Sequence, residues 1–315
     1  MSARFAMVFP GQGAQSVGMV EALAAEFPQI QARFKAASEV LGFDLWKLAS
    51  EGPAETLNKT HHTQPALLAA SVATWDVWLR LGGPEPLLMA GHSFGEYSAL
   101  VCAGALGFED AIALVAARGQ FMQAAVAVGA GAMAAVLGFD LSALKDVCLE
   151  AARGEVVECA NLNAPGQIVI SGAASAVSRA GELAKARGAK RVVPLTVSVP
   201  AHCALMLPAS RKFGELVARA EITPPRIPVI HNTDVAAHSQ VSDIKAALVA
   251  QLANPVRWQE TIELFAREGI TQALECGPGK VLGPLIRRCA NEISTASLGT
   301  PEDLRNALES LHTGG

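Results

Sequence analysis

Short apolar runs that end in proline and glycine alternate along this chain with longer stretches of helical periodicity. The first run, residues 4–9, ends in Pro-Gly-Gln-Gly, which is typical of a buried strand followed by a tight loop. Residues 17–41 carry apolar positions at helical spacing. Residues 63–79 predict a buried helix, with Thr63 as its N-cap and Pro65 in its first turn.

The same alternation continues toward the C-terminus. The strands expected there lie at residues 86–90, 227–230 and 273–275, and the helices at residues 96–102, 108–123, 208–220 and 246–252. Strands that alternate with helices and end in turns predict a parallel sheet with helices on both faces.

A region of shorter strands interrupts this alternation near residue 128, where a glycine-rich stretch begins. Strands are expected at residues 132–137, 156–161, 167–171 and 191–197, with helices at residues 141–152 and 176–187. The order strand, helix, strand, strand, helix, strand is that of a ferredoxin-like unit. The sequence therefore predicts an α/β fold with a discontinuous main domain, residues 1–127 and 198–315, and a ferredoxin-like insert, residues 128–197.

The composition favours a large packed core and argues against several classes of protein. Of the 315 residues, 51% are hydrophobic and 17% are charged, so the chain can bury a core and is unlike a disordered segment. The net charge of -4, spread along the chain, argues against nucleic-acid binding. No apolar run is long enough to cross a membrane, and the first residues lack the pattern of a secretory signal. The six cysteines form no C-x-x-C pair, which argues against a metal site and favours free thiols in the cytoplasm.

A candidate nucleophile lies in residues 91–95, which read Gly-His-Ser-Phe-Gly between an expected strand and an expected helix. In this context Ser93 stands on a sharp turn above the sheet. The backbone N–H of Phe94, at the helix N-terminus, then faces a developing oxyanion. An ordinary tight turn with a capping serine is the alternative, but the strand before it and the helix after it favour a nucleophile.

A serine nucleophile requires a base, and the chain has seven histidines. His202 is the strongest candidate because it follows the insert, where a loop can lean over the sheet, although a single loop histidine is more often structural. Common serine hydrolases carry an acid between the serine and the histidine in chain order. No Asp or Glu between Ser93 and His202 lies at an obvious strand end. The sequence therefore predicts a dyad whose histidine is oriented by a group other than a carboxylate.

Several motifs in a fixed order carry a resemblance to a known family. From Phe9 to about Arg288 the sequence resembles the malonyl-CoA:acyl-carrier-protein transacylases of bacterial fatty-acid synthesis. The matching motifs are residues 9–15 (FPGQGAQ), 62–67 (HTQPAL), 91–100 (GHSFGEYSAL), Arg118-Gly119 with Met122-Gln123, 131–134 (GAMA), 161–167 (NLNAPGQ), 198–206 (SVPAHCALM), 254–258 (NPVRW) and 277–282 (GPGKVL).

This resemblance implies an α/β-hydrolase-like main domain with a ferredoxin-like insert, and it implies roles for the matching residues. Ser93 matches the serine that is acylated, and His202 matches its base. The backbone N–H groups of Gln12 and Phe94 match the oxyanion hole. The histidine of this family is held by backbone carbonyls near the position of Gln251, which agrees with the missing acid.

The resemblance also implies what the site binds. Arg118 matches the arginine that binds the free carboxylate of the malonyl group, and Gln251 is counted with it among the substrate-binding positions. Malonyl-CoA is then a substrate, with no cofactor and no metal. Phe94 stands where the family usually carries an aliphatic residue such as leucine. Its ring is therefore expected to narrow the acyl pocket or to alter the packing beside it.

Acyl carrier protein is the partner that the resemblance implies, and the family suggests a monomer. Carrier proteins are acidic, so a basic surface near the mouth of the site is expected. Two groups of basic residues are candidates for docking, with ordinary solvated helix faces as the alternative: Lys185, Arg187, Lys190 and Arg191 in the insert, and Lys280, Arg287 and Arg288 near the C-terminal helix.

Other functions fit parts of the sequence. The same chemistry would serve a malonate decarboxylase subunit or a polyketide acyltransferase, and the residues do not separate these from fatty-acid synthesis. A serine esterase or thioesterase fits the Gly-x-Ser-x-Gly motif, but Arg118 and the missing acid argue against it. A carrier-binding module without catalysis would have no need for Ser93, His202, Gln12 and Arg118 together.

Overall fold

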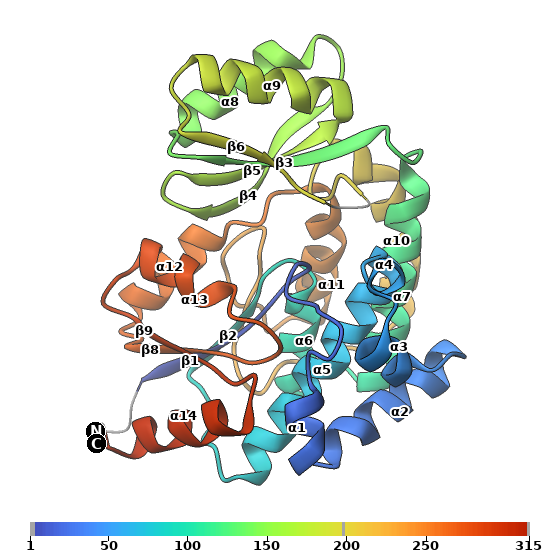
Figure 1. Ribbon diagram of the computed structural model, residues 1–315, viewed down its shortest axis with the longest axis vertical. Coiled ribbons are helices and arrows are strands. Elements are labelled where there is room, and N and C mark those ends of the chain that lie inside the picture. The colour runs from blue at the N-terminus through green and yellow to red at the C-terminus, as the bar shows by residue number, and fades with distance from the viewer. Residues whose placement is uncertain (1–3, 197–198, 314–315) are drawn as a thin grey trace.

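The computed structural model describes residues 4–196 and 199–313 and contains two β-sheets (Figure 1). The larger sheet is parallel, with the strand order β7-β2-β1-β8-β9. Its strands are β1 (Phe5–Phe9), β2 (Leu88–Gly91), β7 (Val229–Ile230), β8 (Gln272–Glu275) and β9 (Ser294–Ser297). The predicted parallel sheet is therefore confirmed, with β9 as an edge strand that the sequence pattern did not predict.

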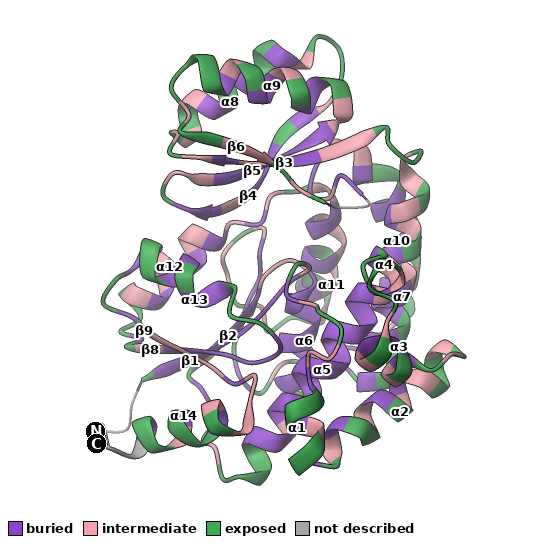
Figure 2. Ribbon diagram, viewed as in Figure 1, coloured by how far each residue is buried: buried purple, intermediate pink, exposed green. Residues whose placement is uncertain are grey.

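Strand β1 is buried on both faces, and its alternating side chains enter two separate cores. Phe5, Met7 and Phe9 belong to one hydrophobic cluster, whereas Ala6 and Val8 belong to the other. Because successive side chains of a strand point to opposite faces, the sheet is the middle layer of three. Figure 2 shows the inner strands β1, β2 and β8 as largely buried, the edge strand β9 as less buried and the outer helix surfaces as exposed.

Most helices pack on the face that Phe5, Met7 and Phe9 enter. They are α1 (Glu21–Glu26), α2 (Gln29–Leu41), α3 (Leu45–Glu51), α4 (Ala54–Leu57), α5 (Thr60–Arg80), α6 (Gly95–Cys102), α7 (Phe108–Ala125), α10 (Leu207–Arg219), α11 (Val241–Ala250) and α14 (Pro301–Thr313). The other face is covered by α12 (Trp258–Arg267) and α13 (Leu282–Cys289). No helix of the described residues is long and apolar enough to cross a membrane.

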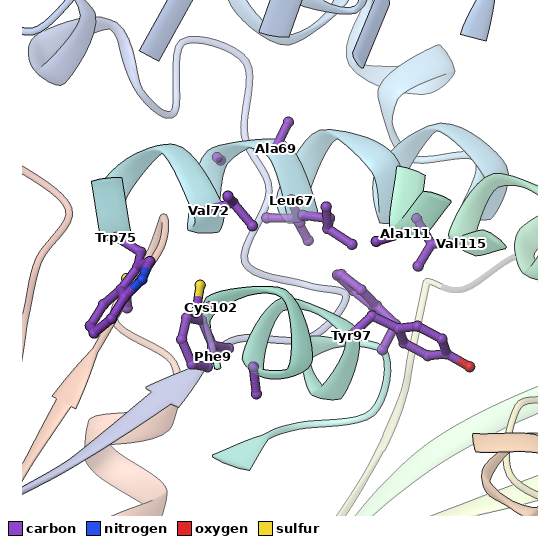
Figure 3. Packing of buried hydrophobic residues seen from close by; sticks show 14 of the residues in the cluster. Phe9, Leu67, Ala69, Val72, Trp75, Tyr97, Cys102, Ala111 and Val115 are labelled. Carbon is purple, nitrogen blue, oxygen red and sulfur yellow. The ribbon is translucent and has the colours of Figure 1, made fainter. Parts of the chain in front are cut away.

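Helix α5 lies at the centre of the larger core. Figure 3 shows Leu67 and Val72 of α5 facing α6, whose Cys102 lies beside Phe9 of β1 and whose Tyr97 lies at its other end. Each such aliphatic side chain contributes roughly 1.5–3 kcal/mol by leaving water. This packing anchors α6, and therefore the turn that precedes it, to the sheet.

The smaller sheet is antiparallel, with the order β4-β5-β3-β6. Its strands are β3 (Gly131–Leu137), β4 (Val157–Ala164), β5 (Gln167–Ala173) and β6 (Arg191–Pro194), and its helices are α8 (Leu141–Ala152) and α9 (Ala174–Ala186). This order and connectivity confirm the ferredoxin-like prediction. Both helices cover the face that points away from the main domain (Figure 1). The predicted limit at 197/198 lies outside the described residues, and the domain limits stay predictions.

The helical spacing of residues 17–41 corresponds to two helices, because the chain leaves α1 at Phe27 and α2 begins after Pro28. Two predictions about the start of α5 need correction. Helix α5 begins at Thr60, so Thr63 is not its N-cap: the Thr63 hydroxyl donates to the Leu57 carbonyl at 2.6 Å. Pro65 lies inside α5, beyond the first turn.

The strand predicted at residues 191–197 is also too long. Strand β6 ends at Pro194, and residue 197 lies outside the described residues.

Candidate active site

Ser93 occupies a sharp turn between β2 and α6. Its backbone has a φ of 54°, in the left-handed region that side-chain-bearing residues rarely adopt. A Cβ on Gly91 would lie 1.9 Å from the Gly95 carbonyl carbon, and one on Gly95 would lie 2.5 Å from the Phe9 carbonyl oxygen. The two glycines of the motif are therefore required by contact between β1, β2 and α6.

The Ser93 hydroxyl contacts the imidazole of His202, a residue that follows the insert in the chain. The distance between Ser93 Oγ and His202 Nε2 is 2.7 Å, and that between His202 Nδ1 and the Gln251 carbonyl oxygen is 2.8 Å. A carbonyl oxygen can only accept, so Nδ1 carries the proton and Nε2 is left to accept one from the serine. The expectation that a group other than a carboxylate orients the histidine is thus met by the backbone of Gln251.

The surroundings of His202 disfavour its protonated form. Its side chain is buried, and burial together with the nearby Arg118 guanidinium lowers its pKa to about 3, against the hydrogen bond to the Gln251 carbonyl. The imidazole is therefore neutral at physiological pH and available as a proton acceptor.

A cavity of about 310 Å³ lies over this pair, between the two domains. The main domain lines it with Gln12, Phe94 and Arg118, and the small domain with Met133, Asn161 and Leu195. In the described part of the chain, the backbone N–H groups of Gln12 and Phe94 donate to no protein acceptor. Two free donors beside a serine hydroxyl suit an oxyanion.

Arg118 lies in this cavity wall with 1% of its surface exposed. Its Nη2 donates to the side-chain oxygen of Gln251 at 2.9 Å, and its Nη1 contacts the Met122 sulfur at 3.2 Å. Its Nε has no partner among the described residues, and no carboxylate forms an ion pair with it there. A buried cation left in this state is costly, so the cavity is prepared for an anion.

Two other predicted positions have side chains that are fully buried. The Phe94 ring is 1% exposed and belongs to the larger core, which fixes its packing beside the cavity. Gln251 is 0% exposed and lies behind Arg118. Its role as a direct substrate contact stays a prediction.

Sequence reasoning missed a polar network beneath the elbow. Asn232 accepts from the Ser93 N–H at 2.7 Å and donates to the Gly91 carbonyl at 2.7 Å, so one amide holds both sides of the turn. The Asn232 N–H and His231 Nδ1 both bind the Glu96 carboxylate. These contacts join positions 135–141 residues apart, and no local pattern announces them.

The fold and the Ser93–His202 pair define an α/β-hydrolase-like protein with a nucleophile elbow, and comparisons with known proteins agree. The family model described as "Acyl transferase domain" matches residues 6–299. A malonyl CoA-acyl carrier protein transacylase of Salmonella typhimurium is 51% identical over 97% of this chain and 99% of its own, and one of Bacillus subtilis is 45% identical over 98% and 97%. The chain belongs to the malonyl CoA-acyl carrier protein transacylase family.

Solved structures of the family share the complete fold. The Coxiella burnetii malonyl CoA-acyl carrier protein transacylase superposes with a TM-score of 0.98 at 48% identity, covering 99% of this chain and 98% of its own. A malonyl-transacylase solved in complex with a type II PKS acyl-carrier protein has a TM-score of 0.97 at 52% identity, covering 98% and 100%.

Proposed function

We propose that this protein transfers a malonyl group from malonyl-CoA to the phosphopantetheine thiol of acyl carrier protein, through a malonyl-serine on Ser93. One observation carries the proposal: a buried arginine without a carboxylate partner shares a cavity with a serine–histidine pair. The names of relatives that are 51% identical over 97% of this chain support the same reaction.

The first half-reaction acylates the serine. Neutral His202 accepts the Ser93 proton at Nε2 while Oγ attacks the thioester carbonyl. The N–H groups of Gln12 and Phe94 stabilise the resulting oxyanion, each by roughly 3 kcal/mol. The tetrahedral adduct collapses, and coenzyme A leaves as a thiol that takes its proton from His202.

The second half-reaction reverses these steps with a new thiol. The carrier's phosphopantetheine thiol gives its proton to His202 and attacks the malonyl-serine carbonyl. Ser93 leaves and recovers its proton from His202 Nε2. The two thioesters are of similar energy, so this chemistry requires no cofactor.

Arg118 is the specificity group of this proposal. Its planar guanidinium can bind a carboxylate through two parallel hydrogen bonds, which a lysine cannot reproduce. An acetyl group offers no such carboxylate and leaves the buried cation unpaired. Malonyl-CoA is therefore preferred over acetyl-CoA.

We propose a docking surface at one end of the small sheet. Leu137 of β3 pairs with Arg191 on one side and with Gln167 on the other, and Gln167 accepts from Arg288 Nη1 at 3.1 Å. Basic side chains of both predicted groups therefore flank the same sheet end, which Lys190 joins as an exposed neighbour. Such a surface suits an acidic carrier protein.

A second cavity, of about 340 Å³, opens beside this surface. Gln167 and Arg288 line it, and it shares Gln12 and His92 with the first cavity. We assign the pantetheine arm to this route, because it joins the basic surface to Ser93. Arg187 and Lys280 contribute less to docking, since Arg187 is paired with Glu150 and Lys280 with Asp303.

We place the reaction in the cytoplasm, where carriers of fatty-acid or polyketide synthesis would meet the protein. The cysteines are free thiols, five of them buried, which suits a reducing compartment.

Intact-mass spectrometry after brief mixing with malonyl-CoA tests the proposed function. We expect a malonyl-sized increment that maps to Ser93, is absent from Ser93→Ala and is minor with acetyl-CoA. No increment on the wild-type protein, or one that survives Ser93→Ala, would overturn the covalent mechanism. Rapid hydrolysis of neutral esters without a gain from a carrier thiol would favour an esterase.

A further inference from the structure

Glu96 is a carboxylate at the centre of the main domain, three residues after the nucleophile. Its residue surface is 0% exposed. One oxygen accepts from His231 Nδ1 at 2.7 Å, and the other accepts from the Asn232 N–H and from Gln251 Nε2, each at 2.9 Å. Burying a carboxylate is costly unless donors surround it, and here three donors do so.

The contact with Gln251 determines which way this amide points. Gln251 Nε2 donates both to Glu96 and to the Ser93 carbonyl, at 2.9 Å and 3.0 Å. An amide nitrogen cannot accept, so both acceptors fix the nitrogen on their side. The amide oxygen must then face the opposite way, where it accepts from Arg118 Nη2.

Gln251 consequently separates Glu96 from Arg118. Burial lowers the pKa of Arg118, and the nearby Tyr97 and Glu96 side chains oppose this lowering. A direct ion pair would instead occupy the guanidinium with a protein carboxylate. The chain of hydrogen bonds from Glu96 through Gln251 to Arg118 stabilises the guanidinium cation. It leaves Nε and part of the guanidinium without a carboxylate partner.

His231 holds Glu96 on its other side. Both side chains are at most 1% exposed. Burial alone would lower the pKa of His231, but the Glu96 carboxylate and, less strongly, Asp234 outweigh it and raise the pKa. The imidazole donor therefore keeps one carboxylate oxygen turned away from the site, which leaves the other for Gln251.

We propose that Glu96 is the positioning residue that orients the Gln251 amide and thereby keeps Arg118 ready for a substrate carboxylate. This inference rests on the malonyl transfer proposed above. Glu96 touches no reacting atom, and its effect is on acyl selectivity.

Glu96→Gln tests this role with a side chain of the same shape. Its amide oxygen would keep the Asn232 N–H and Gln251 Nε2 as donors, because its nitrogen can face only the His231 ring, which can change tautomer. The variant therefore removes the charge and weakens the acceptor that holds the Gln251 amide. We expect the apparent KM for malonyl-CoA to rise and the malonyl-over-acetyl selectivity of Ser93 acylation to fall about tenfold, as for a lost hydrogen bond to a charged group. Glu96→Asp keeps the charge and is expected to recover part of this selectivity.

Glu275 provides a matched control. It is also a buried carboxylate, but it accepts from the N–H groups of Leu282 and Gly283 at the start of α13. Glu275→Gln should lower the thermal unfolding midpoint and leave selectivity unchanged. Equal selectivity in wild type, Glu96→Gln and Glu275→Gln would overturn the inference.

The double variant Glu96→Gln/Gln251→Glu provides a second test, and it keeps one carboxylate in the same network. It places that carboxylate directly against Arg118, so malonyl preference should disappear while a folded protein is retained. A swapped variant with wild-type selectivity would overturn the inference even if Glu96→Gln does not fold. If wild-type protein forms no malonyl-serine, the proposed function itself fails, which is a separate outcome.

Discussion

At the scale of single residues, the serine and the histidine of the reacting pair share an uncommon backbone conformation. Ser93 has a φ of 54° and His202 a φ of 62°. Non-glycine residues in this region cost of order 1–3 kcal/mol each, and the surrounding contacts must hold them there. Asn232 does this for Ser93, and the His202 N–H donates to the Leu252 carbonyl at 3.0 Å. Both side chains are thereby fixed before substrate arrives.

The neutral state of His202 can be observed directly. A histidine with a pKa near 6.5 is mostly protonated at pH 5, whereas His202, with its pKa lowered to about 3, is almost entirely neutral there. We expect the ¹⁵N resonance of its Nε2 to keep the shift of an unprotonated nitrogen down to pH 5, with His202→Ala for assignment. A titration midpoint between pH 6 and 7 would contradict this electrostatic account.

Removing the Arg118 guanidinium should change which acyl group the serine takes. Arg118→Ala removes the only cation among the described residues that line the cavity. A lost charged hydrogen bond weakens binding about tenfold to hundredfold, so malonyl acylation should slow by that factor while acetyl acylation is maintained or increases. Rates of increment formation by intact mass measure both. Parallel loss of both activities would assign Arg118 to folding instead.

At the scale of elements, the elbow depends on close approach of backbone segments. We expect Gly91→Ala to destabilise the protein by roughly 3 kcal/mol and to abolish acylation, because its Cβ overlaps α6 backbone. Gly214, inside α10, is the control, since a Cβ there meets only Val249 at 3.5 Å. Gly214→Ala should stabilise the protein by about 0.5–1 kcal/mol. Urea denaturation measures the free energy of unfolding of both variants. Equal changes in this free energy would contradict the requirement for glycine at position 91.

The elements that the sequence predicted have strong local signals. Strand β1 is a buried apolar run that ends in proline and glycine, and the insert combines short strands with helices in a recognised order. Strand β9 reads Ser-Thr-Ala-Ser and lies at the sheet edge, so it lacks an apolar pattern. Helix α5 extends before Thr63 because tertiary packing buries Thr60, which overrides the local capping signal.

At the scale of the whole molecule, the site is assembled from both domains and from distant segments. Ser93 was predictable because its motif is local, and His202 because one loop stood out. Glu96 and Asn232 were not, since their function depends on contacts across more than 130 residues. The roles of Arg118 and Gln251 came from family resemblance alone, because a helical arginine gives no sign of its burial.

Docking of the carrier protein is testable at this scale. Reversing the charges with Lys190→Glu and Arg191→Glu should raise the apparent KM for the carrier about tenfold, because complementary charge promotes encounter and register. Hydrolysis of malonyl-CoA should be unaffected. Arg211→Glu and Lys212→Glu, an exposed basic pair on α10, form the control. An unchanged KM in the first variant, or an equal rise in the control, would place docking elsewhere.

The close backbone contacts around the elbow also limit which codon changes can be tolerated at Gly91 and Gly95. Every single-base change in a glycine codon that still encodes a residue and is not silent adds a Cβ, and neither Gly91 nor Gly95 has room for one. Phe94 lies between Ser93 and Gly95 with its ring in an apolar core, where another apolar side chain can replace it. Within this turn, substitution of Phe94 can therefore change the wall of the acyl pocket, whereas the two glycines keep the geometry of Ser93 constant.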